Sequence, residues 1–238
     1  MKRAITLVMT VLLISTLLVC DSKSGESSEN IKIGLNYELS GNVATYGQSS
    51  VKGIEFAIDE INKAGGVLGK QIELVKVDNK SDSAEAANVS TKLATRDKVV
   101  VILGPATMQN KIPLISSSAT SDDFTVDSNG KVRDYIFRTC FNDSFQGITM
   151  ANFAFSDLKA KKAAILIDNT SDYSKGIGKN FKETFEKLGG EILTEEAYQS
   201  KDTDYKAVLT NIKGTNPDVL YVPGYYEEVG LIIKQARE

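Results

Sequence analysis

From Ile31 to the end of the chain, short runs of apolar, often β-branched residues alternate with longer stretches whose apolar residues recur at helical spacing. The first pair is a strand at 31–35 and a helix at 49–64, which we expect to stop at Gly65-Gly66. We expect further strands at 71–77, 99–103, 113–115, 163–167, 191–198 and 219–222, and helices at 83–96 (with Ser83 as its cap), 144–158, 177–188, 205–213 and from 227 onward. This alternation predicts an α/β protein with two doubly wound, mainly parallel-sheet lobes, at 31–140 and 141–238.

One connection in the first half is too short for this pattern. The continuous apolar run 99–103 is typical of a strand covered on both faces. Parallel strands need a crossover of about a dozen residues, usually a helix, and 104–112 cannot hold a normal one. We therefore expect both lobes to be incomplete, the first through this crossover and both through the absence of a closing strand after Glu238.

The N-terminal segment has the layout of a secretory signal peptide. Lys2 and Arg3 precede an apolar run over 4–19, which passes directly into the polar residues 21–30. A transmembrane anchor is the alternative, but the run is short for a membrane span. We interpret 1–20 as an export signal and 21–30 as a flexible linker.

The end of that run, Leu17-Leu18-Val19-Cys20, resembles the lipobox of bacterial lipoproteins. The resemblance implies that Cys20 is diacylated and holds the protein on a membrane, since two or more acyl chains give stable anchoring. Val19 departs from the small residue usual there, and a plain signal peptide with an incidental cysteine stays open. Cys140 then has no partner for an internal disulfide, and we expect it to be a small buried apolar residue.

Composition argues against several function classes. The chain has 28 basic and 31 acidic residues, without the basic excess of nucleic-acid binders. It contains no histidine, and neither a glycine-rich nucleotide motif nor a zinc spacing of its two cysteines. We therefore expect no enzyme, no cofactor and no metal.

Small hydroxyl residues follow a predicted strand end, where open α/β sheets place their ligand sites. The segment 116–120 reads Ser-Ser-Ser-Ala-Thr after the strand ending at Ile115. Its hydroxyls and free backbone N–H groups are suited to a carboxylate, and a backbone carbonyl to an ammonium proton. A serine-rich turn without a ligand is the alternative.

The order of segments resembles the type I periplasmic binding proteins of ABC importers, in the branch that binds leucine, isoleucine and valine. The phrases that carry the resemblance run from Ile31 to the end of the chain: Ile33-Gly34, Leu39-Ser40-Gly41, Tyr46-Gly47, the helix phrase Gly53 to Asn62 with Ala64-Gly65-Gly66, Gly104-Pro105, Ile112-Pro113-Leu114-Ile115-Ser116, Ser118-Ala119-Thr120, Phe137-Arg138-Thr139 with Asp143, Asp172-Tyr173 and Pro217-Asp218-Val219.

The resemblance implies a set of ligand-binding residues in a cleft between the lobes. Ser118, Ala119 and Thr120 would hold the ligand's carboxylate and amino group, and Tyr46 would lie at the mouth of the cleft. From the second lobe, Asp143 would lie near the cleft, and Tyr173 and Tyr225 would close over the ligand. Packing at an edge is the alternative for Tyr225 and its neighbour Tyr226, and helix capping is the alternative for Asp143.

Two departures from the family pattern accompany these assignments. The family has a serine-rich loop and a full helix after Gly104-Pro105, and only Thr107 offers a substitute for its ligand-binding serine. The family also continues past the point where this chain ends, and that stretch supplies the acidic residue that pairs with the ligand's ammonium group.

The resemblance implies an exported substrate-binding component of an ABC importer, in the periplasm or at the cell surface. It would capture an amino acid, of the branched-chain type, and deliver it as a monomer to a permease in the membrane. A ligand-sensing receptor ectodomain on the same fold and a truncated remnant that binds nothing are the alternatives.

Overall fold

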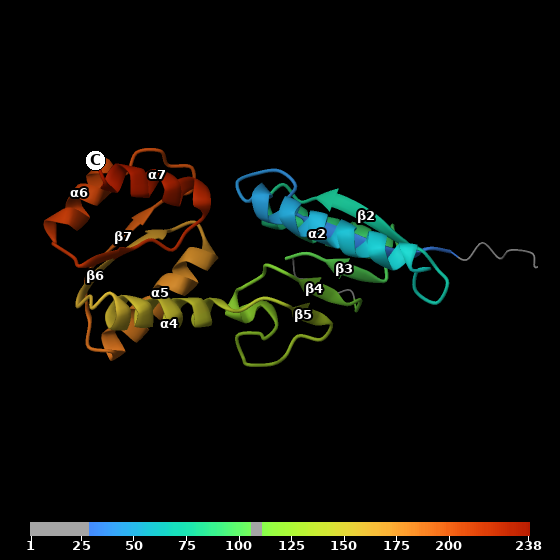
Figure 1. The fold of residues 1–238 in the computed structure, drawn as a ribbon, viewed down its shortest axis with the longest axis horizontal. Helices are drawn as coiled ribbons and strands as arrows, with labels where there is room; N and C mark the ends of the chain where they lie inside the picture. Colours follow the sequence, from blue (N-terminus) through green and yellow to red (C-terminus); the bar gives the residue numbers. More distant parts are fainter. Residues whose placement is uncertain (1–28, 106–110) are drawn as a thin grey trace, which may run out of the picture.

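The computed structural model describes residues 29–105 and 111–238, which form two α/β units with a parallel sheet each (Figure 1). The first lobe has five strands in the order β2-β1-β3-β4-β5, and the second has three in the order β7-β6-β8. Neighbouring strands within each sheet run parallel. The prediction of an α/β fold with parallel sheets is confirmed. The predicted signal peptide, Cys20, Thr107 and most of the linker lie outside the described residues.

In the first lobe, strands and helices follow one another as β1 (Ile31–Tyr37), α2 (Ala44–Lys63), β2 (Ile72–Asp78), α3 (Ser83–Thr95), β3 (Val101–Leu103), β4 (Leu114–Ser116), the short 3-10 helix η1 (Asp122–Phe124) and β5 (Ile136–Arg138). The second lobe consists of α4 (Asp143–Asn152), its π-helical continuation η2 (Phe153–Asp157), β6 (Lys162–Asp168), α5 (Asp172–Lys187), β7 (Glu191–Tyr198), α6 (Lys206–Gly214), β8 (Val219–Tyr221) and α7 (Tyr226–Ala236).

Several details differ from the sequence-based expectations, and three of them affect helix or strand boundaries near the site. Helix α2 begins at Ala44, five residues earlier than predicted, because its first turn carries little of the apolar periodicity that defines the rest. Helix α3 is capped by Asp82, not Ser83: the Asp82 carboxylate accepts a hydrogen bond from the Glu85 N–H at 2.7 Å. The short edge strand β5 was not predicted.

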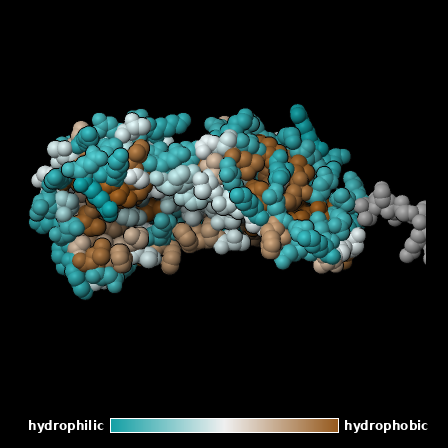
Figure 2. Space-filling view, turned by 45° about the horizontal axis from the view of Figure 1, so that its top comes forward, coloured by the Kyte–Doolittle hydropathy of each residue, from teal (hydrophilic) through white to brown (hydrophobic). Residues whose placement is uncertain are grey.

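The two faces of the first sheet are covered unequally. On one face, Ile102, Leu114 and Ile136 are buried against α3 and the η1 residue Phe124. The opposite face carries a row of residues that are in register across four strands, namely Leu35, Leu103, Ile115 and Phe137. Along this row exposure increases from 0% at Leu35, under α2, to 54% at Phe137. Apolar surface is visible on both lobes in Figure 2.

The predicted cover over both faces of 99–103 is therefore wrong. Val100 is 55% exposed, and Val101 and Leu103 are only partly buried. Ten residues, 104–113, separate β3 from its parallel neighbour β4 in the sequence. Among the described helices, α2 packs mainly on β1 and β2, so it leaves this part of the sheet face open.

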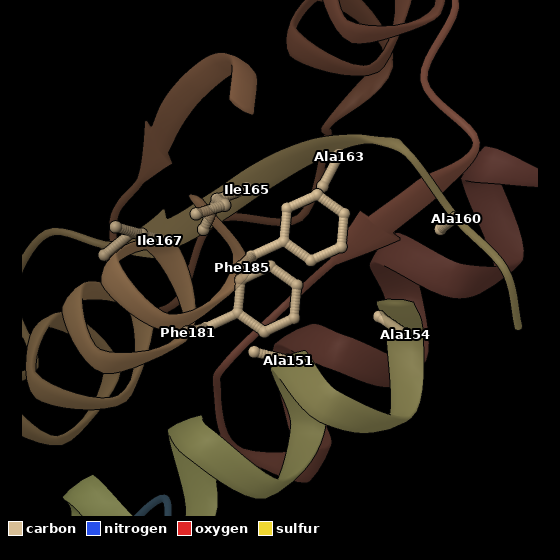
Figure 3. Packing of buried hydrophobic residues seen from close by; sticks show 8 residues of the cluster. All are labelled: Ala151, Ala154, Ala160, Ala163, Ile165, Ile167, Phe181 and Phe185. Carbon is tan, nitrogen blue, oxygen red and sulfur yellow. The ribbon is translucent and has the colours of Figure 1, made fainter. Parts of the chain in front are cut away.

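The second lobe has its central strand covered on both faces. Ala163, Ile165 and Ile167 of β6 pack against Phe181 and Phe185 of α5 and against three alanines, of which Ala151 belongs to α4 (Figure 3). The opposite face of β6 packs against Leu209 and Ile212 of α6 and Ile232 of α7. Such burial on both faces is typical of parallel sheets.

Residues 139–142 lead from β5 into α4 and are tied back to the first lobe. The Thr139 N–H donates to the Ser116 carbonyl and the Asp143 N–H donates to the Thr120 carbonyl, each at 2.9 Å. The start of α4 is thereby fixed beside the loop that follows β4. Within the described ranges, no helix has the length and apolar character needed to cross a bilayer.

Candidate functional site

A cavity of ≈ 560 Å³ lies between the two lobes, beside the carboxyl ends of the strands. All seven cleft residues assigned from the resemblance line it: Tyr46, Ser118, Ala119 and Thr120 from the first lobe, and Asp143, Tyr173 and Tyr225 from the second. Phe124 and Phe141 add apolar wall. The volume falls in the range of small-molecule sites.

The loop after β4 is organised around the buried hydroxyl of Ser116. Its Oγ accepts hydrogen bonds from the Ser118 N–H at 3.2 Å and the Ala119 N–H at 2.8 Å. Two backbone N–H groups of the segment 116–120, where free donors were expected, are therefore already bonded, because a buried hydroxyl requires partners. The side-chain hydroxyls of Ser118 and Thr120 also lie on this wall, and that of Thr120 is near enough to Asp143 to lower the pKa of its carboxyl by hydrogen bonding.

Arg138, at the end of β5, holds the same loop from behind. Its Nη1 donates to the backbone carbonyls of Ala119, Thr120 and Ser121 at 3.4, 3.1 and 2.9 Å. Its Nη2 contacts the Thr125 hydroxyl at 3.3 Å. One guanidinium group therefore fixes three successive peptide units, which places the hydroxyl side chains before any ligand arrives.

Two tyrosines form the opposite wall. The rings of Tyr173, in the first turn of α5, and Tyr225, which precedes α7, are stacked with centroids 5.1 Å apart. The Tyr173 hydroxyl accepts a hydrogen bond from Gln146 Nε2 at 3.3 Å. Burial raises the pKa of Tyr225 to about 12, so its hydroxyl is a neutral donor near neutral pH. The pair offers an apolar surface with polar tips.

Tyr46 lies where the lobes meet. Its ring centroid is 6.3 Å from that of Tyr225 and 5.6 Å from that of Tyr226. With 48% of its surface exposed, Tyr46 is at the mouth of the cavity. Tyr226 is also exposed, and unlike Tyr225 it does not line the cavity.

Asp143 begins α4 but does not cap it. Asn142 is the cap, since its side chain accepts a hydrogen bond from the Phe145 N–H at 3.1 Å. The capping alternative for Asp143 is therefore wrong. Asp143 is only 3% exposed, and its Oδ1 has no hydrogen-bond partner among the described residues. Burial raises the pKa of this carboxyl, while the Thr120 side chain and the charge of Arg138 lower it.

The cavity also includes residues that the sequence did not single out. Glu38 directly follows β1, and Gln146 lies one turn after Asp143 in α4. Cys140 lines the cavity with its Sγ 3.5 Å from the Ala119 carbonyl, so the expectation of a buried Cys140 is wrong. Among the described residues, no group of three or more potential metal ligands is found.

Two known proteins of similar sequence are named for the amino acids that they bind. The chain is 31% identical over 220 residues to the Leu/Ile/Val-binding protein BraC3 of Rhizobium johnstonii, with 88% of the chain and 58% of that protein covered. It is 33% identical over 223 residues to the leucine-, isoleucine-, valine-, threonine-, and alanine-binding protein of Pseudomonas aeruginosa, with 89% and 58% covered.

Solved structures agree with these relatives. The branched-chain amino acid transporter substrate binding protein LivJ of Streptococcus pneumoniae, solved in complex with isoleucine, matches with a TM-score of 0.79 and 47% identity, over 88% of this chain and 61% of that one. The leucine binding protein LivK of Thermotoga maritima matches with a TM-score of 0.75 and 32% identity, over 87% and 60%.

The chain thus spans about three fifths of the length of the proteins it matches. The sequence profile of one family, described as periplasmic binding protein, covers residues 30–238. With its parallel-sheet lobes and the cavity between them, the chain belongs to the periplasmic binding protein family.

Proposed function

We propose that this chain captures a small α-amino acid with a branched, apolar side chain, as the substrate-binding component of an ABC importer. The observation that carries the proposal is one cavity that joins the hydroxyl loop of the first lobe to the stacked Tyr173 and Tyr225 of the second. The printed names of the relatives, which are leucine-, isoleucine- and valine-binding proteins, support the same ligand class.

In this proposal the two walls of the cavity contact different parts of the ligand. The hydroxyls of Ser118 and Thr120 donate hydrogen bonds to the ligand's carboxylate. The rings of Tyr173 and Tyr225, with Phe124 nearby, cover an aliphatic side chain, and each buried CH₂ contributes about 0.8 kcal/mol. Approach of the lobes then hides the ligand from water, as in hinge closure around ligands.

In this proposal the protein is exported and held at the membrane through a lipid on Cys20. A permease recognises the closed, ligand-bound arrangement of the lobes. The family is one of periplasmic binding proteins, which supports an exported location.

Isothermal titration calorimetry of the purified protein with leucine, isoleucine, valine, alanine, lysine and glutamate tests the proposal. We expect the three branched amino acids to bind more tightly than the others. A protein that is folded by circular dichroism and binds none of them would contradict the proposal and favour the non-binding remnant.

A pair of adjacent tyrosines provides a matched control. Tyr225→Ala should weaken leucine binding about tenfold or more, as is typical of a buried aromatic contact. Tyr226→Ala should weaken binding much less, because Tyr226 does not line the cavity and loses only its contact with Tyr46. Equal losses in the two variants would show that both residues act through packing at the edge of the lobe.

A further inference from the structure

The cavity between the lobes is acidic. Among the described residues that line it, two carry a carboxyl group, Glu38 and Asp143, and none is a lysine or arginine. A ligand with an ammonium group is favoured in such a site over an uncharged or purely anionic one.

The backbone carbonyls of the loop after β4 already have hydrogen-bond partners, so they are not sufficient acceptors for that ammonium group. Those of Ala119 and Thr120 already accept hydrogen bonds from Arg138, and the Cys140 thiol also contacts the Ala119 carbonyl. Asp143 is almost fully buried, and burial together with the charge of Asp122 raises the pKa of its carboxyl. The loop carbonyls are thus already bonded, and the Asp143 carboxylate is hardly accessible.

Glu38 is the more accessible of the two carboxyl groups in the cavity. It is partly exposed on the cavity wall, and its neighbours are its own backbone N–H, the Asn79 side chain and the like-charged Asp78. None of the ion pairs found among the described residues includes Glu38. It also lines an adjoining cavity of ≈ 440 Å³, and burial raises the pKa of its carboxyl, an effect that a neighbouring ammonium group would offset.

The backbone of Glu38 is held in place. Gly47 of α2 packs so closely on it that a Cβ at Gly47 would lie 2.1 Å from the Glu38 carbonyl oxygen. The next residue, Leu39, donates its N–H to Asp78 Oδ1 at 2.9 Å. This rigidity reduces the entropy lost when the side chain binds a ligand.

We propose that Glu38 binds the ammonium group of the captured amino acid, as the negative counterpart to the hydroxyls of Ser118 and Thr120. The inference rests on the proposed function and names a ligand contact that the family resemblance did not assign. It changes the expectation that the acidic partner of the ligand lies only in the stretch that follows Glu238 in the family.

The test compares leucine with 4-methylpentanoate, which has the same carbon skeleton and carboxylate but no amino group. Calorimetry is carried out on the unmodified protein, on Glu38→Gln and on Glu73→Gln, which removes an exposed charge on β2 outside the cavity. Thermal unfolding followed by circular dichroism shows that each variant is folded.

We expect the unmodified protein and Glu73→Gln to bind leucine at least about tenfold more tightly than 4-methylpentanoate, since hydrogen bonds between charged partners contribute about 1.5–3 kcal/mol. Glu38→Gln should lose about tenfold or more of its leucine affinity, while its affinity for 4-methylpentanoate stays the same or rises.

Two results would overturn the assignment of Glu38. If Glu38→Gln weakens both ligands equally, the residue is structural; if it weakens neither, another group binds the ammonium. A folded, unmodified protein that binds no amino acid would instead overturn the proposed function, and this inference with it.

Discussion

The two faces of the first sheet use the same strands and reach opposite outcomes. Leu114 is completely buried under α3, whereas its neighbour Ile115 points to the other face and is only partly buried. The sequence of β4 is apolar at both positions, so the difference arises from what packs above each face. Strand composition alone does not decide burial; the covering helix does.

The largest expected effect is on the covered face. Leu114→Ala should lower the free energy of unfolding by about 2–5 kcal/mol, because it leaves a cavity in a core that cannot collapse around it. Ile115→Ala removes a similar side chain from the open face and should cost clearly less. Urea denaturation of both variants measures the difference, and equal losses would show that the open face is also packed.

Helix α3, which covers the buried face of the first sheet, can be destabilised at its N-terminus. Asp82→Ala removes the cap of α3 and should cost about 1 kcal/mol, since the Glu85 N–H loses its partner. Asp82→Asn keeps a capping oxygen and should cost much less. The same denaturation experiment applies, and a full loss in Asp82→Asn would show that the cap acts through its charge instead.

A substitution on the open face should have the smallest effect on stability. Its main consequence should be a change in self-association of the protein. Phe137→Ser should change the free energy of unfolding by about 0.5 kcal/mol or less, as is usual at exposed sites. It should also reduce self-association, because β5 is an edge strand that carries an exposed apolar side chain.

Light scattering against protein concentration measures this self-association. Phe56→Ser is the control, since Phe56 is exposed on α2 and lies outside the row that ends at Phe137. Unchanged association in Phe137→Ser would show that the open face does not drive contact between molecules.

Periodicity predicted most of the α/β alternation, and its failures have local causes. Glu38 was missed because the first strand was expected to end at Leu35, whereas β1 continues to Tyr37. The residue that interrupts the apolar run is Asn36, which is buried because its amide donates to the Ala86 carbonyl and the Ser90 hydroxyl. A buried polar residue with distant partners looks like the end of a strand in the sequence.

The placement of the cleft residues was anticipated from family resemblance, but the supporting contacts were not. Arg138 donates hydrogen bonds to backbone carbonyls 17 to 19 residues away in the sequence. The Ser116 hydroxyl accepts hydrogen bonds from two N–H groups in a segment where free N–H groups were expected. Such contacts depend on how β4 and β5 pair, which no local pattern encodes.

In the described part of the chain, the path from one lobe to the other runs once, through residues 139–142. The contacts of Tyr46 with Tyr225 and Tyr226 join the two lobes directly and favour their closed arrangement. Ligand affinity then depends on the fraction of molecules that are already closed, because the apparent dissociation constant is the intrinsic one divided by that fraction. A substitution at Tyr46 therefore changes affinity in two ways, because Tyr46 lines the cavity and also contacts the second lobe.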